Sequence, residues 1–274
     1  MKSVFCKRRL ILNTIRVIHR FEKLLERVEN TKVNPLVNDI VFDGACLTPE
    51  LELYIKKIIS LFPDASLERR HCTQISVLPP LWHGEGSTFN EPIFVSNLKE
   101  AEDKYSLVCG GADYRGNPYL QTIKLYKFPD YIDSRVAKVF LIYATIHEYA
   151  HTISRASYYW EEFAFNYLRI VNPEKPMYNL KIKGRNFDPK KWQDEFLAIA
   201  LTYPPITNYS AIYKDEEAGN LRHHEYMAEY ITTYLMGIAM NLKMLERWCG
   251  LGDRPELESK IKEFLEAKAN IKYV

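Results

Sequence analysis

Two histidines and a glutamate in residues 147–151 carry the groups needed for metal-dependent hydrolysis. The segment reads His147-Glu148-Tyr149-Ala150-His151, so the two histidines are four residues apart. On a helix this spacing puts both imidazoles on one face, where both can reach a single ion. Zinc accepts imidazole nitrogen and keeps one position for water in a catalytic site. Glu148 could take a proton from zinc-activated water and deliver it to a leaving amine, so the segment predicts a Zn²⁺-dependent peptidase with Glu148 as general base.

The residues around this segment are mostly apolar. Residues 139–146, which precede it, are rich in Val, Phe, Leu, Ile and Ala, and Thr152-Ile153 follow it. A helix that is apolar nearly all round is typical of the centre of a domain. The alternative is a pair of core histidines with an accidental glutamate between them, but two imidazoles and a carboxylate are costly to bury without partners. We therefore expect a buried helix that carries a metal site.

A third metal ligand must come from elsewhere in the chain. The pattern HExxHxxGxxH is absent, because serines occupy positions 154 and 157. The candidate carboxylates downstream are Glu161, Glu162, Asp188, Asp194, Glu195, Glu225 and Glu229. Glu225 and Glu229 share one face of an otherwise apolar helix, where like charges repel unless they have a use. One of them could bind zinc while the other orients a ligand histidine; the alternatives are that both are solvated, or that His223 or His224 supplies the ligand.

The HEYAH segment, followed by a helix that reads EYMAE at 225–229, resembles a known family. It is similar to the gluzincin zinc metallopeptidases of the anthrax lethal factor and Pro-Pro endopeptidase type, which include bacterial toxins and effectors. The resemblance covers roughly residues 120–240. It implies that His147, His151 and Glu225 are the zinc ligands, and that Glu229 supports the ligand shell.

The same resemblance implies a tyrosine whose hydroxyl stabilises the oxyanion. In the family this tyrosine lies in a short loop upstream of the glutamate ligand. The nearest match here is Tyr209, in Asn208-Tyr209-Ser210-Ala211, and Tyr213 is a competing candidate. The family's chemistry would make the chain a zinc endopeptidase of protein or peptide substrates.

The elements that must position these residues form one domain of the α+β class over residues 1–274. The resemblance implies a zincin-like fold, in which a small mixed sheet packs on a mostly helical body with the HExxH helix at its centre. Residues 1–66 are expected to be helical, with helices over residues 4–30 and 48–61. Residues 67–130 are expected to form the sheet, with strands at residues 74–78, 92–95, 106–109 and 120–128. We expect the strand at residues 120–128 to be the sheet edge to which an extended substrate adds.

Residues 131–274 are expected to be mainly helical and to carry the zinc site. A helix should begin at Asp133 or Ser134 and continue past His151. The other expected helices cover residues 158–170, 189–201, 221–244 and 255–269, with Pro189 and Pro255 near two of their starts. The helix at residues 4–30 has a basic face, and its glutamates favour packing on the domain over contact with a membrane.

Composition bounds the remaining possibilities. Of the 274 residues, 47% are hydrophobic and 26% are charged, which is typical of a globular protein. The net charge of +2 produces no strong positive potential that would attract a nucleic acid. The five cysteines are scattered without a Cys-x-x-Cys pair, so neither a cysteine zinc site nor a disulfide framework is expected. The oligomeric state stays open.

Residues 1–12 lack the continuous apolar core of a standard signal peptide, and the longest apolar stretch is far too short for a transmembrane segment. Together with the resemblance to toxins, this favours a virulence effector that is secreted without a cleaved signal and acts in the host cytosol. The alternatives are a cytoplasmic regulatory peptidase, or a catalytically silent binding module that would use the helix at residues 4–30 and the aromatic cluster at residues 158–160.

Overall fold

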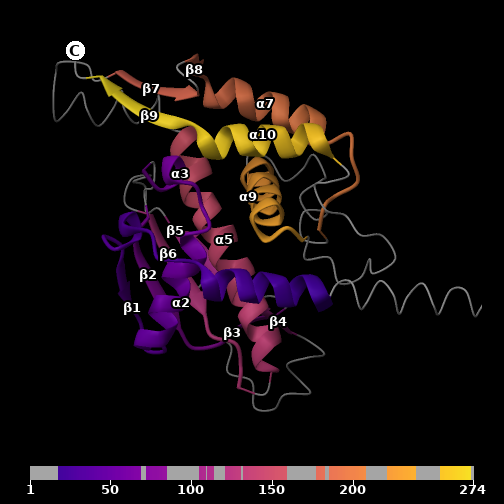
Figure 1. Ribbon diagram of the computed structural model, residues 1–274. Helices are drawn as coiled ribbons and strands as arrows, with labels where there is room; N and C mark the ends of the chain where they lie inside the picture. The colour runs from indigo at the N-terminus through magenta and orange to yellow at the C-terminus, as the bar shows by residue number, and fades with distance from the viewer. Residues whose placement is uncertain are drawn as a thin grey trace, which may run out of the picture.

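The structure is a computed structural model in which α-helices and β-strands are both present (Figure 1). It describes residues 18–68, 72–84, 105–108, 110–113, 121–130, 132–158, 177–182, 185–207, 221–238 and 254–272. The α+β fold class expected from the sequence is confirmed. The expected strand at residues 92–95 and most of the expected helix at residues 158–170 lie outside the described residues.

A four-stranded sheet forms one layer of the molecule. Its order is β1 (Val41–Asp43), β2 (Cys72–Leu78), β6 (Gln121–Tyr126) and β5 (Gly110–Asp113). The first three strands run parallel, and β5 runs antiparallel to β6. Gly44, directly after β1, has a φ of 111° and lies against the backbone of β2, so this turn requires glycine.

The sheet topology corrects the expectation that residues 120–128 form a sheet edge. The strand in this region, β6, pairs with β2 on one side and β5 on the other, so it lies inside the sheet. Its alternating burial shows two different faces, but alternation of faces carries no information about how many neighbours a strand has. The edge strand next to it is β5.

Two further sheets lie outside this layer. Strand β3 (Leu81–Gly84) pairs with β4 (Tyr105–Val108), which covers most of the strand expected at residues 106–109. A three-stranded antiparallel sheet has the order β8 (Arg185–Phe187), β7 (Met177–Ile182) and β9 (Lys268–Lys272). The expectation that residues 131–274 are mainly helical did not include these three short strands. These strands are three to six residues long and β7 pairs with residues about ninety positions later, which local periodicity cannot reveal.

The helices begin where their capping residues predict. In α2 (Pro49–Ile59) the Thr48 side chain accepts from the Leu51 backbone N–H, and in α7 (Pro189–Ala200) Asp188 accepts from the Lys191 N–H. Helix α10 (Pro255–Glu266) also starts at its proline. The described part of the first half also contains a short helix, α3 (Asp64–Glu68), and a 3₁₀ turn, η1 (Pro35–Val37).

Two helices end earlier than the sequence predicts. Helix α9 (Leu221–Met236) stops before Gly237, whose φ of 71° is the left-handed conformation that ends many helices, and so does not continue to residue 244. Helix α10 stops at Glu266, because residues 268–272 join β7 as strand β9. In both cases the apolar pattern continues beyond the true end of the helix.

Helix α5 (Ser134–Tyr158) runs through the middle of the molecule, between the four-stranded sheet and α9 (Figure 1). It contacts β5 and β6 on one side and α2, α7 and α9 on others. Residues 144–154 are all buried, so the expected central apolar helix is confirmed. Among the residues that the structure describes, none of the helices combines the length and apolar character needed to cross a bilayer.

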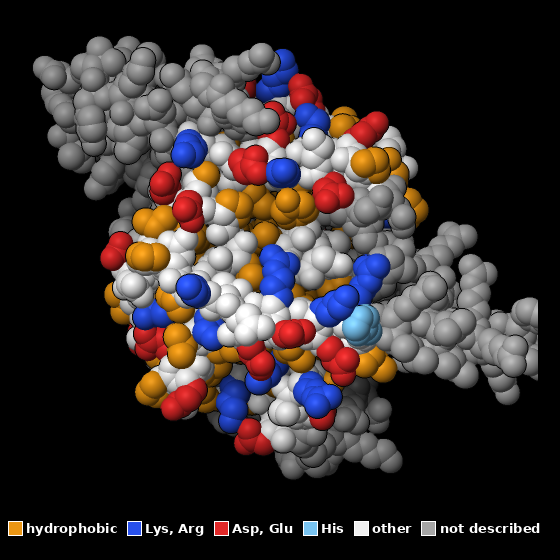
Figure 2. All heavy atoms as spheres, viewed as in Figure 1, with side chains coloured by type: hydrophobic (Ala, Val, Ile, Leu, Met, Phe, Trp, Pro, Cys, Tyr) orange, Lys and Arg blue, Asp and Glu red, His pale blue; other side chains and the backbone are white. Residues whose placement is uncertain are grey.

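The helix over residues 18–30 packs across α5 and α9. Leu24 and Val28 are buried in the core, and the Arg27 guanidinium donates to the Leu235 carbonyl of α9 at 2.7 Å. This agrees with the expected packing role of the helix. On the face shown in Figure 2, basic and acidic side chains are interspersed, so that face offers no single-sign surface for a nucleic acid.

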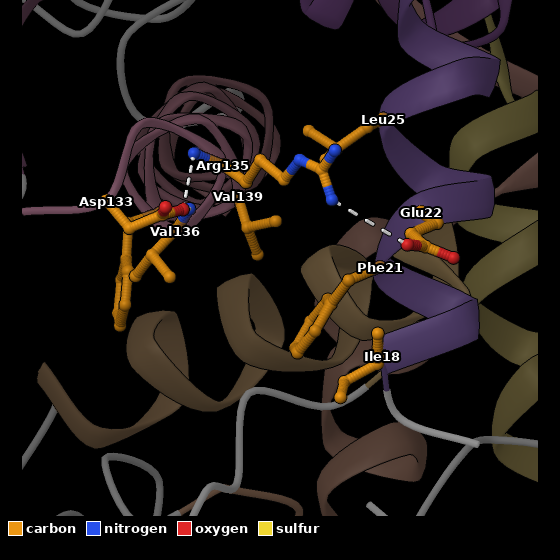
Figure 3. A pocket seen from close by; sticks show the side chains of 9 residues that line it. Ile18, Phe21, Glu22, Leu25, Asp133, Arg135, Val136 and Val139 are labelled. Atoms are coloured by element: carbon orange, nitrogen blue, oxygen red, sulfur yellow. Dashed lines mark hydrogen bonds and ion pairs between the residues drawn. The ribbon is translucent and has the colours of Figure 1, made fainter. Parts of the chain in front are cut away.

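An apolar hollow of about 310 Å³ lies between this helix and the first turns of α5 (Figure 3). It is lined by Ile18, Phe21, Glu22, Leu25, Asp133, Arg135, Val136, Val139 and Phe140. An ion pair of 3.9 Å between Arg135 and Glu22 spans it. None of the predicted site residues lines this hollow.

Candidate metal centre

His147, His151 and Glu225 meet where α5 packs against α9. The two imidazole Nε2 atoms are 3.1 Å apart. Glu225 Oε2 lies 3.2 Å from His147 Nε2 and 3.3 Å from His151 Nε2. His147 and Glu225 are 78 positions apart in the chain, yet their side chains and that of His151 direct three possible ligand atoms toward one small volume.

These separations fit ligands of one metal ion. In a tetrahedral zinc site with bonds of about 2.1 Å, any two ligand atoms are about 3.4 Å apart. The three observed separations, 3.1, 3.2 and 3.3 Å, are close to this value. Two imidazole nitrogens and one carboxylate oxygen also form one of the donor sets found in catalytic zinc sites. The group could therefore bind a metal ion.

Local structure explains how the ligands are presented. His147 and His151 are one helical turn apart on α5, with 5% and 2% of their surfaces exposed. Glu225 lies in the first turns of α9, and its side chain is 13% exposed. The ligand group is thus largely buried, and Glu225 is its most exposed member.

Glu229 lies behind His147, one turn after Glu225 on α9. It is fully buried, and its Oε1 is 2.9 Å from His147 Nδ1. The hydroxyl of Tyr143 donates to Oε1 and the hydroxyl of Thr207 donates to Oε2. The structure therefore puts Glu229 where the orienting partner of a ligand histidine belongs.

The charges in this group are strongly coupled. Burial alone would lower the pKa of His147, but hydrogen bonds with Glu225 and Glu229 raise it well above the usual value. Burial alone would raise the pKa of Glu225, but the adjacent His151 and His147 hold it well below the usual range. A cation bound among these residues would replace a proton, so metal affinity should fall as the pH falls.

Glu148 lies on α5 next to the ligands but is not a member of the ligand group. It is 8% exposed, and it packs against the backbone of Gly110 in the edge strand β5. A Cβ atom at position 110 would lie 2.8 Å from Glu148 Cγ and 3.2 Å from Glu148 Oε1. Burial and, second, the charge of Glu148 raise the pKa of Tyr126 on the neighbouring strand β6.

Sequence reasoning missed Gly110, Tyr143 and Thr207. For Gly110 a signal was present, because paired glycines in a strand often mark a close approach of another group. Tyr143 is one helical turn before His147, a spacing that also could have indicated contact. Thr207 had no such signal, since it reaches Glu229 only through the tertiary fold.

The other candidate ligands and tyrosines either have another role in the structure or lie outside the described residues. Asp188 caps α7, and Asp194 and Glu195 are exposed on that helix, where Glu195 pairs with Lys260 at 2.6 Å. Glu161, Glu162, Tyr209 and Tyr213 are outside the described residues, as are the side chains of His223 and His224. The described part of the chain thus supplies one candidate set of ligands.

Comparison of the chain with protein-family models, curated proteins and solved structures finds no match. Its chemistry must therefore be argued from the atoms of the site. They form a buried group of His147, His151 and Glu225 that could bind a metal ion, with the carboxylate of Glu148 beside it.

Proposed function

We propose that this chain is a zinc-dependent endopeptidase that hydrolyses a peptide bond in a protein or peptide substrate. One observation carries the proposal. A buried carboxylate, that of Glu148, directly follows the first of three converging ligands and stays outside the ligand group. A structural metal site has no need of such a neighbour, whereas a hydrolytic site needs a base that does not bind the metal. The central position of α5 and the antiparallel edge strand β5 also support a zincin-like fold.

Each residue of the site has a separate task in this proposal. His147, His151 and Glu225 hold the ion, and Glu229 holds the proton of His147 at Nδ1. Bound zinc would supply Lewis acidity toward a peptide carbonyl and would make water more acidic. The Glu148 carboxylate takes a proton from the attacking water and passes it to the leaving amine. Tyr209, from the family resemblance, is proposed to donate to the oxyanion.

The substrate is expected to bind along β5. This strand pairs with β6 on one side, and no strand among the described residues pairs with its other side. An extended peptide can add to such an edge through main-chain hydrogen bonds. Because Gly110 of β5 contacts Glu148, a peptide on this edge would pass beside the proposed base.

Metal-dependent cleavage tests the proposal. The purified chain is stripped with a chelator, one half is reloaded with one equivalent of zinc, and both are incubated with a broad peptide library analysed by mass spectrometry. We expect new peptide termini only with the zinc-loaded half. A chain that binds zinc stoichiometrically and cleaves nothing would reject the peptidase and favour the silent binding module.

Gly110→Ala should lower kcat/KM on the best library peptide at least about tenfold, equivalent to about 1.4 kcal/mol of transition-state stabilisation. The added Cβ would lie 2.8 Å from Glu148 Cγ and 3.2 Å from the Lys124 carbonyl oxygen, so the carboxylate must shift. Gly111→Ala is the matched control, because a Cβ there meets nothing within 4 Å. Equal loss of activity in both variants would show that β5 tolerates no alanine, rather than that Gly110 positions Glu148.

A further inference from the structure

The carboxylate of Glu229 accepts hydrogen bonds from two hydroxyls and lies close to an imidazole nitrogen. Its Oε1 accepts from the Tyr143 hydroxyl and lies 2.9 Å from His147 Nδ1, while its Oε2 accepts from the Thr207 hydroxyl. Glu229 is fully buried. An ionised carboxylate only accepts hydrogen bonds, so a nitrogen as close to it as His147 Nδ1 is favoured in its protonated form.

This arrangement selects one tautomer of His147. With its proton on Nδ1, the imidazole keeps the lone pair of Nε2 for the ligand group, where Nε2 lies 3.1 Å from His151 Nε2. The other tautomer would face a lone pair of Nδ1 toward the carboxylate, which is unfavourable. The orientation of Glu229 therefore decides whether His147 can act as a ligand.

The two hydroxyls come from different parts of the chain. Tyr143 is one turn before His147 on α5, and its ring centroid is 5.5 Å from that of His147. Thr207 lies after α7 and reaches Glu229 from a segment that belongs to neither α5 nor α9. Because each hydroxyl occupies a different oxygen, the carboxylate cannot turn away from His147 without breaking a buried hydrogen bond.

We infer that Tyr143 and Thr207 are positioning residues of the metal centre, which set its metal affinity by clamping Glu229 against His147 Nδ1. Neither belongs to the candidate ligand group, and both act through Glu229. The inference rests on the metal-binding half of the proposed function and is independent of the hydrolytic half. Loss of a partner behind a ligand histidine typically weakens metal binding 10–100-fold.

Tyr143→Phe and Thr207→Val remove the two hydroxyls with little change in shape. Zinc dissociation constants are measured by competition with a chromophoric chelator, and the visible absorption of the cobalt-substituted proteins reports ligand geometry. We expect each variant to bind zinc roughly 10–100-fold more weakly than the wild type and to show an altered cobalt spectrum. Thr207→Ser, which keeps the hydroxyl, should restore both measurements most of the way.

Two matched controls remove hydroxyls that do not reach Glu229. Thr145→Val acts on a buried residue of α5 two positions before His147, and Tyr54→Phe acts on α2; neither hydroxyl has a hydrogen-bond partner among the described residues. Both controls should bind zinc as the wild type does. The unfolding midpoints of all metal-free proteins are measured alongside, since a purely structural role would lower the midpoint and leave the cobalt spectrum unchanged.

The outcomes separate this inference from the proposed function. The inference alone is overturned if Tyr143→Phe and Thr207→Val bind zinc with wild-type affinity and have an unchanged cobalt spectrum. It is also overturned if Thr207→Val and Thr207→Ser bind zinc equally weakly. A wild-type chain that binds zinc but cleaves no peptide overturns the peptidase and leaves the inference standing. A wild-type chain that binds neither zinc nor cobalt overturns both.

Discussion

Glu148→Gln is expected to lower kcat for peptide hydrolysis by about 10²–10⁴-fold while zinc remains bound. Glutamine has nearly the same shape as glutamate, so it fits the 8% exposed position between α5 and Gly110 without repacking. Its amide cannot take a proton from water at neutral pH, and the transfer to the leaving amine is lost with it. Single-turnover hydrolysis of a fluorogenic peptide, chosen from the library products, measures the effect.

The companion measurement is the zinc content of the variant. Because Glu148 lies outside the ligand group of His147, His151 and Glu225, Glu148→Gln should retain one zinc per chain. Glu195→Gln is a suitable control, since Glu195 is an exposed carboxylate on α7 that pairs with Lys260. Full activity of Glu148→Gln would remove the general base from the mechanism, and loss of its zinc would make Glu148 a ligand instead.

Glu225→Gln is expected to remove most of the stabilisation of the fold by zinc. If the wild type is given zinc at about 100 times its dissociation constant, its free energy of unfolding should rise by about 2.7 kcal/mol. The variant lacks the carboxylate whose Oε2 lies 3.2 and 3.3 Å from the two imidazole nitrogens. If its dissociation constant rises about a hundredfold, the same zinc concentration should add only about 0.4 kcal/mol.

Denaturant unfolding with and without zinc measures both values, and the metal content of the dialysed proteins gives an independent reading. Asp194→Asn provides the control, because Asp194 is an exposed carboxylate of α7 outside the ligand group. Equal stabilisation of Glu225→Gln and the wild type by zinc would mean that the third ligand lies elsewhere. Restoration of the wild-type baseline by a chelator would confirm that the gain comes from bound metal.

The features that could be predicted from the sequence are those set within one or two helical turns. The caps at Thr48 and Asp188 act on backbone N–H groups three residues away, and both are present in the structure. The spacing of His147 and His151 likewise places them on one face of α5 whatever packs against it. Such relations depend on backbone geometry alone, so the amino-acid order is sufficient to state them.

The ends of the elements and the pairing of the strands could not be predicted from the local sequence. The apolar pattern of α9 continues past Gly237, yet the helix stops there in a left-handed turn. The edge of the sheet is β5 and not β6, since pairing of β6 on both sides depends on strands far away in the chain. These outcomes are decided by competition between long-range partners, which local periodicity does not contain.

The candidate metal centre likewise has features that the sequence predicts and features that depend on the tertiary structure. By itself the sequence determined the residue types, the helical spacing of His147 and His151, and the shared face of Glu225 and Glu229 on α9. Only the tertiary structure decided that α5 and α9 bring three ligand atoms within 3.1 to 3.3 Å of one another, and that Tyr143 and Thr207 converge on Glu229. The physical reason is that contacts between elements follow from how whole side-chain surfaces pack, and no local stretch of residues encodes that packing.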